Sequence, residues 1–274
     1  MDESFMPKLP LSEWVESFVK FLKNQAAGFF DTVSKGIESM ADGLGWLLSI
    51  GGIPGAPYIF IVLTMIIAWR LAGWKTGLFS LIGLGLIHNL GYWAETMDTL
   101  SLIFMSVIIS IAIGIPIGIW MSQKDAVQSL VVPVLDFMQT MPAFVYLIPS
   151  VIFFGIGMVP GIIATIIFAM PPVVRLTNLG IRQVDQELIE ASNAFGSTTV
   201  QRLGKVQIPL AKSSIMAGVN QTIMLALSMV VTASLVGAPG LGEIVYRSVT
   251  QVRIGMGFES GLALVIIAIL LDRI

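Results

Sequence analysis

The sequence predicts an all-α protein, a polytopic bundle of helices that crosses a membrane several times. Of its 274 residues, 55% are hydrophobic and only 12% are charged, whereas a soluble globular protein carries about 25% charged residues. The mean hydropathy is +0.89. Apolar runs that approach the roughly 20 residues needed to span a bilayer recur along the chain. A folded water-soluble protein of this size could not cover its surface with so few charges.

The composition also excludes several classes of function. The chain has no cysteine, so disulfides, thiolate metal sites and cysteine nucleophiles are absent. A single histidine, His88, cannot form a histidine metal cluster and argues against a catalytic triad. High hydrophobicity with a net charge of only −2 argues against disorder and against nucleic-acid binding. We therefore expect no catalytic residues, no metal site and no nucleic-acid partner.

Residues 1–45 differ from the rest of the chain. From Leu11 to Met40 the apolar residues recur largely at helical spacing, with lysines and glutamates between them. Pro10 followed by Ser12 is typical of a helix start. This pattern predicts an amphipathic helix that lies in the membrane interface without crossing it. A soluble helix packed on a partner protein is the alternative, and the sequence leaves open which side of the membrane the segment occupies.

Seven apolar runs predict membrane spans, two accessory spans within residues 46–94 and five core spans within residues 95–274. They are Tyr58–Trp74, Gly77–Trp93, Leu100–Met121, Val127–Phe154, Gly161–Val174 with its extension, Ser214–Val236 and Ser260–Leu271. Prolines interrupt several of them, at Pro116, Pro133, Pro142, Pro149, Pro171 and Pro172. Breaks are tolerated where helices line a protein cavity. They favour a pathway through the membrane, and ordinary kinked packing is the alternative.

The short loops predict the orientation of the spans. Basic residues concentrate in loops that the positive-inside rule assigns to the cytoplasm, namely Arg70, Lys75, Lys124, Arg175, Arg182, Arg202, Lys205 and Lys212. The turn Gly155–Gly161 and the stretch Gly237–Glu259 then lie outside, as do Glu95 and Asp98 between spans two and three. Arg247 and Arg253 oppose this assignment without overturning it. The chain is thus predicted to be a multi-pass protein of the cell membrane.

The hydrophilic segment 182–212 predicts two short helices with a fixed bend between them. The first helix is expected to begin near Asp185 and Glu187 and to end at Gly196. The second is expected to begin at Thr198, with Gln201 three residues later, and the segment ends at Pro209. Carboxylates complement a helix N-terminus, glycine permits a left-handed cap, and threonine with glutamine three residues later forms a capping box. We expect this pair of helices to protrude into the cytoplasm and to bind another protein.

The same segment resembles the EAA loop of ABC-importer permeases. The similarity is carried by Glu190-Ala191-Ser192, by Gly196 after three residues, and by Val206-Gln207-Ile208-Pro209 after nine more. In that family the loop is a coupling helix that docks into a groove of the ATP-binding subunit. The resemblance implies a type I permease fold and implies that ATPase coupling depends on Glu190, Ala191, Ser192, Phe195, Gly196 and Pro209. An amphipathic cytoplasmic loop without a partner is the alternative.

Residues 95–274 more closely resemble the glycine betaine/proline betaine permeases, especially those of osmoregulatory importers from Gram-positive bacteria. Segments 135–149, 154–161, 171–177 and 217–224 carry the similarity. It implies import driven by a partner ATPase that binds ATP and magnesium, with no cofactor in this chain. It also implies a second copy of the permease, contact with membrane lipid, and an extracellular substrate-binding protein or fused domain. An ion-coupled secondary transporter without an ATPase is the competing hypothesis, although it predicts paired intramembrane carboxylates and internal repeats.

Seven residues are candidates for the translocation path: Asp136, Gln139, Pro142, Phe144, Tyr146, Asn220 and Gln221. Asp136 is an ionisable residue within an apolar span, which indicates a functional role. A helix cap at the break before Pro142 is the alternative. Aromatic faces bind quaternary ammonium ions, so Phe144 and Tyr146 could line the path or simply pack in the core.

Three further features complete the sequence-based expectations. His88 is expected to be a hydrogen-bonded packing residue. Gly237–Glu243 lacks the Lys-Ser/Thr of a phosphate-binding loop, so it predicts either a plain turn or a close approach of backbones. The last apolar run, Ser260–Leu271, spans about 18 Å at 1.5 Å per residue, short of the ~30 Å hydrocarbon core. From this we expect the polypeptide to continue after Ile274.

Overall fold

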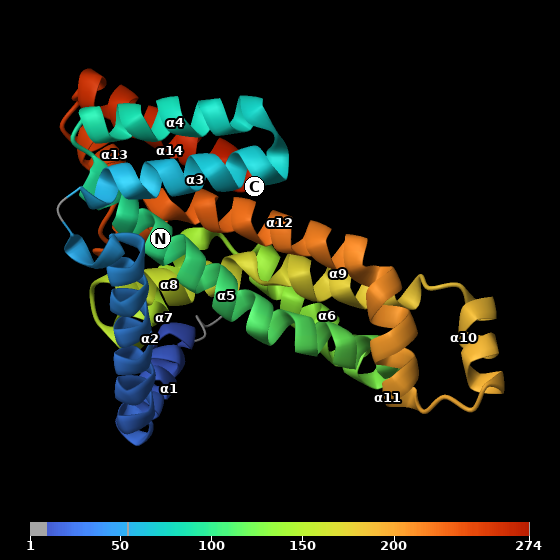
Figure 1. Ribbon diagram of the computed structural model, residues 1–274. Coiled ribbons are helices and arrows are strands. Elements are labelled where there is room, and N and C mark those ends of the chain that lie inside the picture. Colours follow the sequence, from blue (N-terminus) through green and yellow to red (C-terminus); the bar gives the residue numbers. More distant parts are fainter. Residues whose placement is uncertain (1–9, 54, 274) are drawn as a thin grey trace, which may run out of the picture.

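The computed structural model describes residues 10–53 and 55–273, and all regular secondary structure within these ranges is helical (Figure 1). The predicted all-α class is therefore confirmed. The helices are α1 (Leu11–Gln25), α2 (Ala27–Leu48), η1 (Ile50–Gly52), α3 (Ala56–Ala72), α4 (Trp74–Asn89), α5 (Trp93–Gln123), α6 (Asp125–Thr140), α7 (Ala143–Phe154), α8 (Met158–Ala169), α9 (Pro171–Arg182), α10 (Gln186–Ala194), α11 (Thr199–Arg202), η2 (Leu203–Gln207), α12 (Ile208–Ser234), α13 (Leu241–Thr250) and α14 (Ile254–Arg273).

Four helical units of the described chain are long and apolar enough to cross a membrane. They are Trp93–Gln123, Met158–Arg182, Thr199–Ser234 and Ile254–Arg273. The pair α6 and α7 makes a fifth crossing if it is counted as one broken span. The shorter helices α3 and α4 form an antiparallel hairpin that turns at Gly73, whose φ of +94° favours glycine. We call the end of the bundle that carries α10 the coupling end, and the opposite end the distal end (Figure 1).

Helix α9 is held closely between α5 and α12 by glycines. A Cβ atom built on Gly118 of α5 would lie 2.6 Å from Cβ of Thr177 on α9, and one built on Gly114 would lie 2.6 Å from Cγ1 of Val173. On the other side, a Cβ on Gly180 of α9 would lie 2.6 Å from Cβ of Ser214 on α12. Small residues permit such close backbone approach between membrane helices. The helix that leads into the coupling segment is therefore packed tightly on both sides.

The predicted span Val127–Phe154 is not one straight helix. It is divided into α6 and α7, which meet at an angle of 101° around Met141 and Pro142. Proline cannot donate a backbone hydrogen bond and disfavours helical backbone in the preceding residue, so the chain breaks there. The other internal prolines of the predicted spans, Pro116, Pro133 and Pro149, are accommodated within continuous helices.

The N-terminal segment forms two helices, so the single helix expected from Leu11 to Met40 is wrong. The chain bends at Ala26, and α2 continues to Leu48. Figure 1 shows α2 running across the bundle at its distal end. Its buried residues Ile37 and Ala41 pack in a cluster with Leu102 of α5 and Val159 of α8. The other faces of α1 and α2 leave large apolar side chains exposed: Trp14, Val15, Phe18, Phe21, Phe29, Met40 and Trp46. Residues 1–9 of the predicted segment lie outside the described residues.

Three charged residues predicted in loops lie within helices. Glu95 and Asp98 belong to the first turns of α5, which begins at Trp93, and Arg175 belongs to α9.

The last helix is longer than the predicted Ser260–Leu271, because α14 has 20 residues and spans about 30 Å. Glu259 lies inside α14, and its carboxylate accepts a hydrogen bond of 2.9 Å from the hydroxyl of Tyr92.

Candidate coupling and translocation site

The first helix of the coupling segment, α10, ends as the sequence predicts. Its C-terminus is a Schellman motif, in which the amide of Gly196 donates to the carbonyl of Asn193 at 2.9 Å and the amide of Ser197 donates to that of Ser192 at 3.1 Å. Gly196 has a φ of +76°, in the left-handed region that favours glycine. Asp185 is the N-cap residue. These local interactions fix the direction in which the chain leaves α10.

The second helix, α11, begins with the predicted capping box. The amide of Gln201 donates to Oγ1 of Thr198 at 3.3 Å, and the amide of Thr198 donates to Oε1 of Gln201 at 2.9 Å. Arg202 of α11 then donates from Nη1 to Oδ1 of Asn193 at 3.0 Å, which joins the two short helices. The chain continues through the π-helical turn η2 into α12, where Pro209 lies exposed in the first turn. The segment is thus a defined two-helix unit.

The surface of this unit is unusually apolar for an exposed protrusion. Phe195 is 93% exposed and Val200 is 79% exposed, and Leu188 is also exposed. The predicted coupling residues Glu190 and Ala191 are exposed beside them, whereas Ser192 is half-buried with its hydroxyl donating to the carbonyl of Ile189 at 3.0 Å. All three exposed apolar side chains belong to one short protruding segment.

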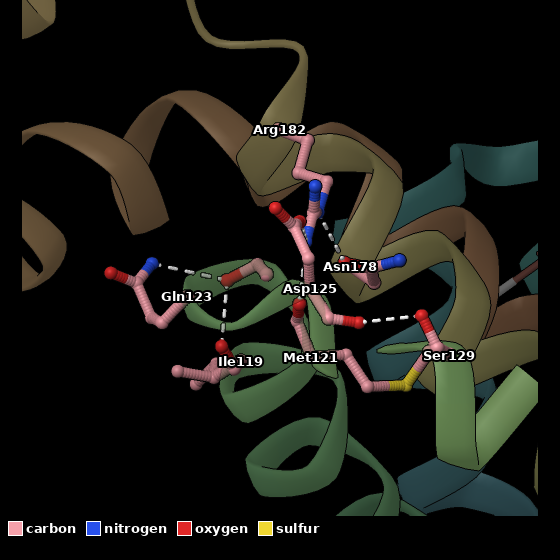
Figure 2. A network of polar contacts seen from close by, with 8 residues as sticks. Ile119, Met121, Gln123, Asp125, Ser129, Asn178 and Arg182 are labelled. Atoms are coloured by element: carbon pink, nitrogen blue, oxygen red, sulfur yellow. Dashed lines mark hydrogen bonds and ion pairs between the residues drawn. The ribbon is translucent and has the colours of Figure 1, made fainter. Parts of the chain in front are cut away.

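Arg182 fastens the base of the coupling segment to the bundle. Figure 2 shows its guanidinium, at the end of α9, beside the corner between α5 and α6. Nη2 donates to the carbonyl of Met121 at 2.9 Å and to Oδ1 of Asp125 at 2.7 Å, and Nε donates to Oδ1 of Asn178 at 3.1 Å. Sequence reasoning missed this network. The i, i+4 spacing of Asn178 and Arg182 is the one local signal that points to it.

The corner itself is closed by further hydrogen bonds (Figure 2). Ser122 donates to the carbonyl of Ile119 at 2.6 Å and accepts from Nε2 of Gln123 at 3.1 Å, while Ser129 donates to the carbonyl of Asp125 at 2.9 Å. Met121 is completely buried beneath this network. The ends of α5 and α9 and the start of α6 therefore form one hydrogen-bonded junction at the coupling end.

Among the predicted path residues, Asp136 has a partner that the sequence did not indicate. Arg175 of α9 donates from Nη2 to Oδ1 of Asp136 at 2.6 Å. Both side chains remain partly exposed, at 38% for Arg175 and 55% for Asp136. The carboxylate thus interacts with a neighbouring helix, which differs from the alternative of a cap at the break before Pro142. An ionisable pair within a spanning region indicates a functional position.

The remaining path candidates fall into two groups. Gln139, Pro142 and Phe144 are exposed around the break between α6 and α7. Tyr146 differs from them, because it is only 5% exposed and its hydroxyl donates across the break to the carbonyl of Met138. It therefore packs the break and does not present its ring on a free surface.

The other two candidates, Asn220 and Gln221, are exposed on α12. The side-chain amide of Asn220 donates to Oδ1 of Asp272 in α14 at 3.4 Å. Both lie on a different helix from Asp136 and its arginine, so the structure divides the predicted set between α6–α7 and α12.

The glycine-rich stretch Gly237–Glu243 is a site of close backbone approach and not a plain turn. The amide of Leu241 donates to Oγ1 of Thr99 in α5 at 2.9 Å. Gly240 has a φ of +121°, and a Cβ atom there would lie 2.5 Å from the same oxygen.

His88 packs edge-to-face against Tyr58 and Trp93. Its Nδ1 has no hydrogen-bond partner among the described residues, so only the packing part of its predicted role is observed.

A bundle of apolar spanning helices with one broken span and a protruding pair of capped helices defines the permease class of ABC importers. The family model described as "Binding-protein-dependent transport system inner membrane component" matches residues 110–272, and the chain belongs to this family. The protein is thus a membrane transport permease. Residues 1–109 lie outside the matched range.

Curated relatives extend the similarity over nearly the whole chain. It is 53% identical over 272 residues to the glycine betaine transport system permease protein OpuAB of Bacillus subtilis, with 98% of this chain and 94% of the relative covered. It is 51% identical to the glycine betaine/carnitine transport permease protein GbuB of Listeria monocytogenes, with 98% and 95% covered. The resemblance to the glycine betaine permeases seen in the sequence is confirmed.

Solved structures support the fold. A crystal form of the MetNI methionine ABC transporter matches with a TM-score of 0.61 at 22% identity, over 66% of this chain and 91% of that one. At this identity the likeness shows the shared fold alone. The predicted type I permease architecture is confirmed.

Proposed function

We propose that the chain is the membrane-spanning subunit of an importer for glycine betaine or a related quaternary amine, driven by ATP hydrolysed on a separate subunit. The observation that carries the proposal is the coupling segment, in which a glycine cap ends α10, a capping box begins α11, and the side chains of Phe195 and Val200 are 93% and 79% exposed. An apolar knob held at a fixed angle is suited to a complementary groove. The names of the relatives supply the substrate class.

In this proposal α10 docks on the ATP-binding subunit. Phe195 fills an apolar pocket there, and Glu190, Ala191 and Ser192 form the face around it. Gly196 and Pro209 set the directions in which the chain leaves and re-enters the bundle. ATP and magnesium are bound by the partner, and this chain contributes no cofactor site. The force on α10 reaches the bundle through Arg182, which is bonded to the corner between α5 and α6.

Two copies of the chain enclose the path, because five core spans supply only half of its wall. The substrate moves past the break between α6 and α7. Phe144 is exposed there and offers the aromatic face on which a quaternary ammonium group binds well. An extracellular substrate-binding protein, or a fused domain, supplies the affinity for capture, so the permease needs only weak contacts such as those of Gln139, Asn220 and Gln221.

The N-terminal helices α1 and α2 lie in the membrane interface at the distal end. Their exposed tryptophans and phenylalanines contact lipid, and the lysines of α1 extend to the polar layer. Helix α2 lies across the bundle in Figure 1, which supports an orientation in the plane of the membrane. The pair of short helices α3 and α4 forms an accessory hairpin beside α14.

The test is uptake of labelled glycine betaine into vesicles that contain the complete transporter, purified with its native partners. We expect uptake only with ATP inside the vesicles and no uptake with a non-hydrolysable analogue. A sodium or proton gradient without ATP serves as the second condition. Uptake driven by a gradient alone would contradict the proposal in favour of an ion-coupled secondary transporter, and ATP-driven uptake of a different solute would leave the class intact but change the substrate.

A further inference from the structure

Two ion pairs join the same two helices, α6 and α9. Arg175 contacts Asp136 at 2.6 Å, and Arg182 contacts Asp125 at 2.7 Å. Both arginines belong to α9 and both aspartates to α6. The helices run antiparallel, so the second pair lies at the coupling end and the first lies nearer the break at Pro142.

The spacing of these charges places each set on one face of its helix. The arginines are seven residues apart and the aspartates eleven, and at 3.6 residues per turn these separations come within about 20° of two and three whole turns. Next to the first pair, Leu135 of α6 packs in a buried cluster with Met121 of α5 and Val174 of α9. Both ion pairs and this apolar contact therefore depend on the register of α6 along α9.

The rest of α6 packs through half-buried side chains such as Val127, Val131 and Met138. Leu135 is its one fully buried side chain among the described residues, and Leu130 and Phe137 are 73% and 63% exposed. The two ion pairs are the polar contacts that join α6 to α9 beside this apolar packing. At the far end of α6, the hydroxyl of Tyr146 bonds to the carbonyl of Met138, which attaches α7 across the break.

We propose that the two ion pairs make α6 move as one body with α9, so that displacement of the coupling segment is delivered to the broken span. Arg175 and Asp136 are positioning residues in this mechanism. A slip of α6 along α9 would separate both pairs at once. Because the four side chains are partly or largely exposed, each pair by itself is a weak constraint, and the register of the two helices depends on the pairs acting together. The inference rests on the proposed ATP-driven transport and specifies how α10 reaches the path.

The first test compares transport with ATP hydrolysis in the complete transporter. The neutral variants D136N and R175Q should insert, bind the ATPase and hydrolyse ATP, but the amount of substrate imported per ATP should fall by about fivefold or more. The charge-swapped variant D136R/R175D restores the pair and should recover most of the ratio. The matched control E243Q/R247Q removes an ion pair of similar exposure that lies within α13, and it should leave the ratio unchanged.

An unchanged ratio in D136N and R175Q would overturn the proposal. So would an inserted D136R/R175D protein that remains uncoupled, because the two residues would then act separately and not as a pair. Wild-type transporter that shows no ATP-driven uptake at all would instead refute the proposed function. The two failures are therefore distinguishable in one set of vesicles.

A second test does not depend on removing charge. The chain has no native cysteine, so S129C on α6 and Q183C at the end of α9 can be joined by a flexible bifunctional maleimide. These positions are exposed beside Asp125 and Arg182. If the helices move together, the linked protein should transport at the rate of the single-cysteine variants treated with the same reagent. Loss of transport on linking would mean that α6 and α9 move relative to each other, which contradicts the proposal.

Discussion

Gly118 of α5 lies so close to Thr177 of α9 that a Cβ atom at position 118 would be 2.6 Å from Cβ of the threonine and 2.7 Å from the carbonyl oxygen of Val174. Neither neighbour can yield easily, because one is a β-branched side chain and the other is helix backbone. This contact, with that of Gly114 one turn away, determines how close the two central helices lie. It also makes position 118 a sensitive probe of the fold.

The variant G118A is expected to destabilise the bundle. Overpacking of a well-packed interior costs about 1–3 kcal/mol, so the apparent midpoint of thermal unfolding in detergent should fall by several degrees. The matched control is G85A in α4, where a Cβ atom would meet no heavy atom within 4 Å. That variant should be neutral or slightly stabilising, because alanine favours a helix over glycine by roughly 1 kcal/mol. Equal midpoints for the two variants would contradict the close packing of α5 on α9.

Phe195 tests the docking surface. Its side chain is 93% exposed and contributes little to the stability of the isolated chain. If it is an interface hot spot, F195A should weaken binding of the ATP-binding subunit by about 2 kcal/mol or more, measured by co-purification and by titration of the purified subunits. V249A removes a 72% exposed apolar side chain from α13 and should bind as the wild type does. Unaltered binding by F195A would mean that the surface around Phe195 is not part of the interface with the ATP-binding subunit.

The left-handed conformation of Gly196 predicts a graded series of variants. At a φ of +76°, asparagine is tolerated whereas a β-branched residue is strained by roughly 1–3 kcal/mol. No heavy atom lies within 4 Å of the added Cβ position, so the effect comes from the backbone alone. We expect G196N to retain most ATP-driven transport and G196V to lose most of it, with membrane insertion intact in both. Equal transport by G196N and G196V would indicate that the shape of this bend is unimportant for coupling.

The orientation of the bundle is tested by labelling single cysteines. V200C on α11 and V249C on α13 are well suited, since the native side chains are 79% and 72% exposed and the chain has no cysteine of its own. In cells that express the permease without its ATP-binding subunit, which would otherwise cover Val200, a membrane-impermeant maleimide should label V249C from outside, and V200C should react only after the membrane is opened. Labelling of both from the same side would contradict the predicted topology, because the basic residues of 182–212 would then not define the cytoplasmic face.

The sequence by itself determined the features that depend on neighbouring residues. Composition established a membrane bundle, and short-range chemistry established the coupling unit, since the glycine cap at Gly196 and the capping box of Thr198 with Gln201 involve residues within five positions of each other. The similarity of residues 95–274 to known permeases followed from the same printed residues. These interactions form wherever the segment lies, so the local pattern is enough to predict them.

Only the tertiary structure decided which distant residues meet. Asp136 and Arg175 are 39 residues apart, and Asp125 and Arg182 are 57 apart, so no local spacing pairs them. Hydropathy also failed at the break of Val127–Phe154 and at the packing of α2, because an apolar residue has the same hydropathy whether it faces lipid or another helix. In a membrane the distinction between these two environments comes from close packing and polar pairing, and both are properties of the assembled bundle.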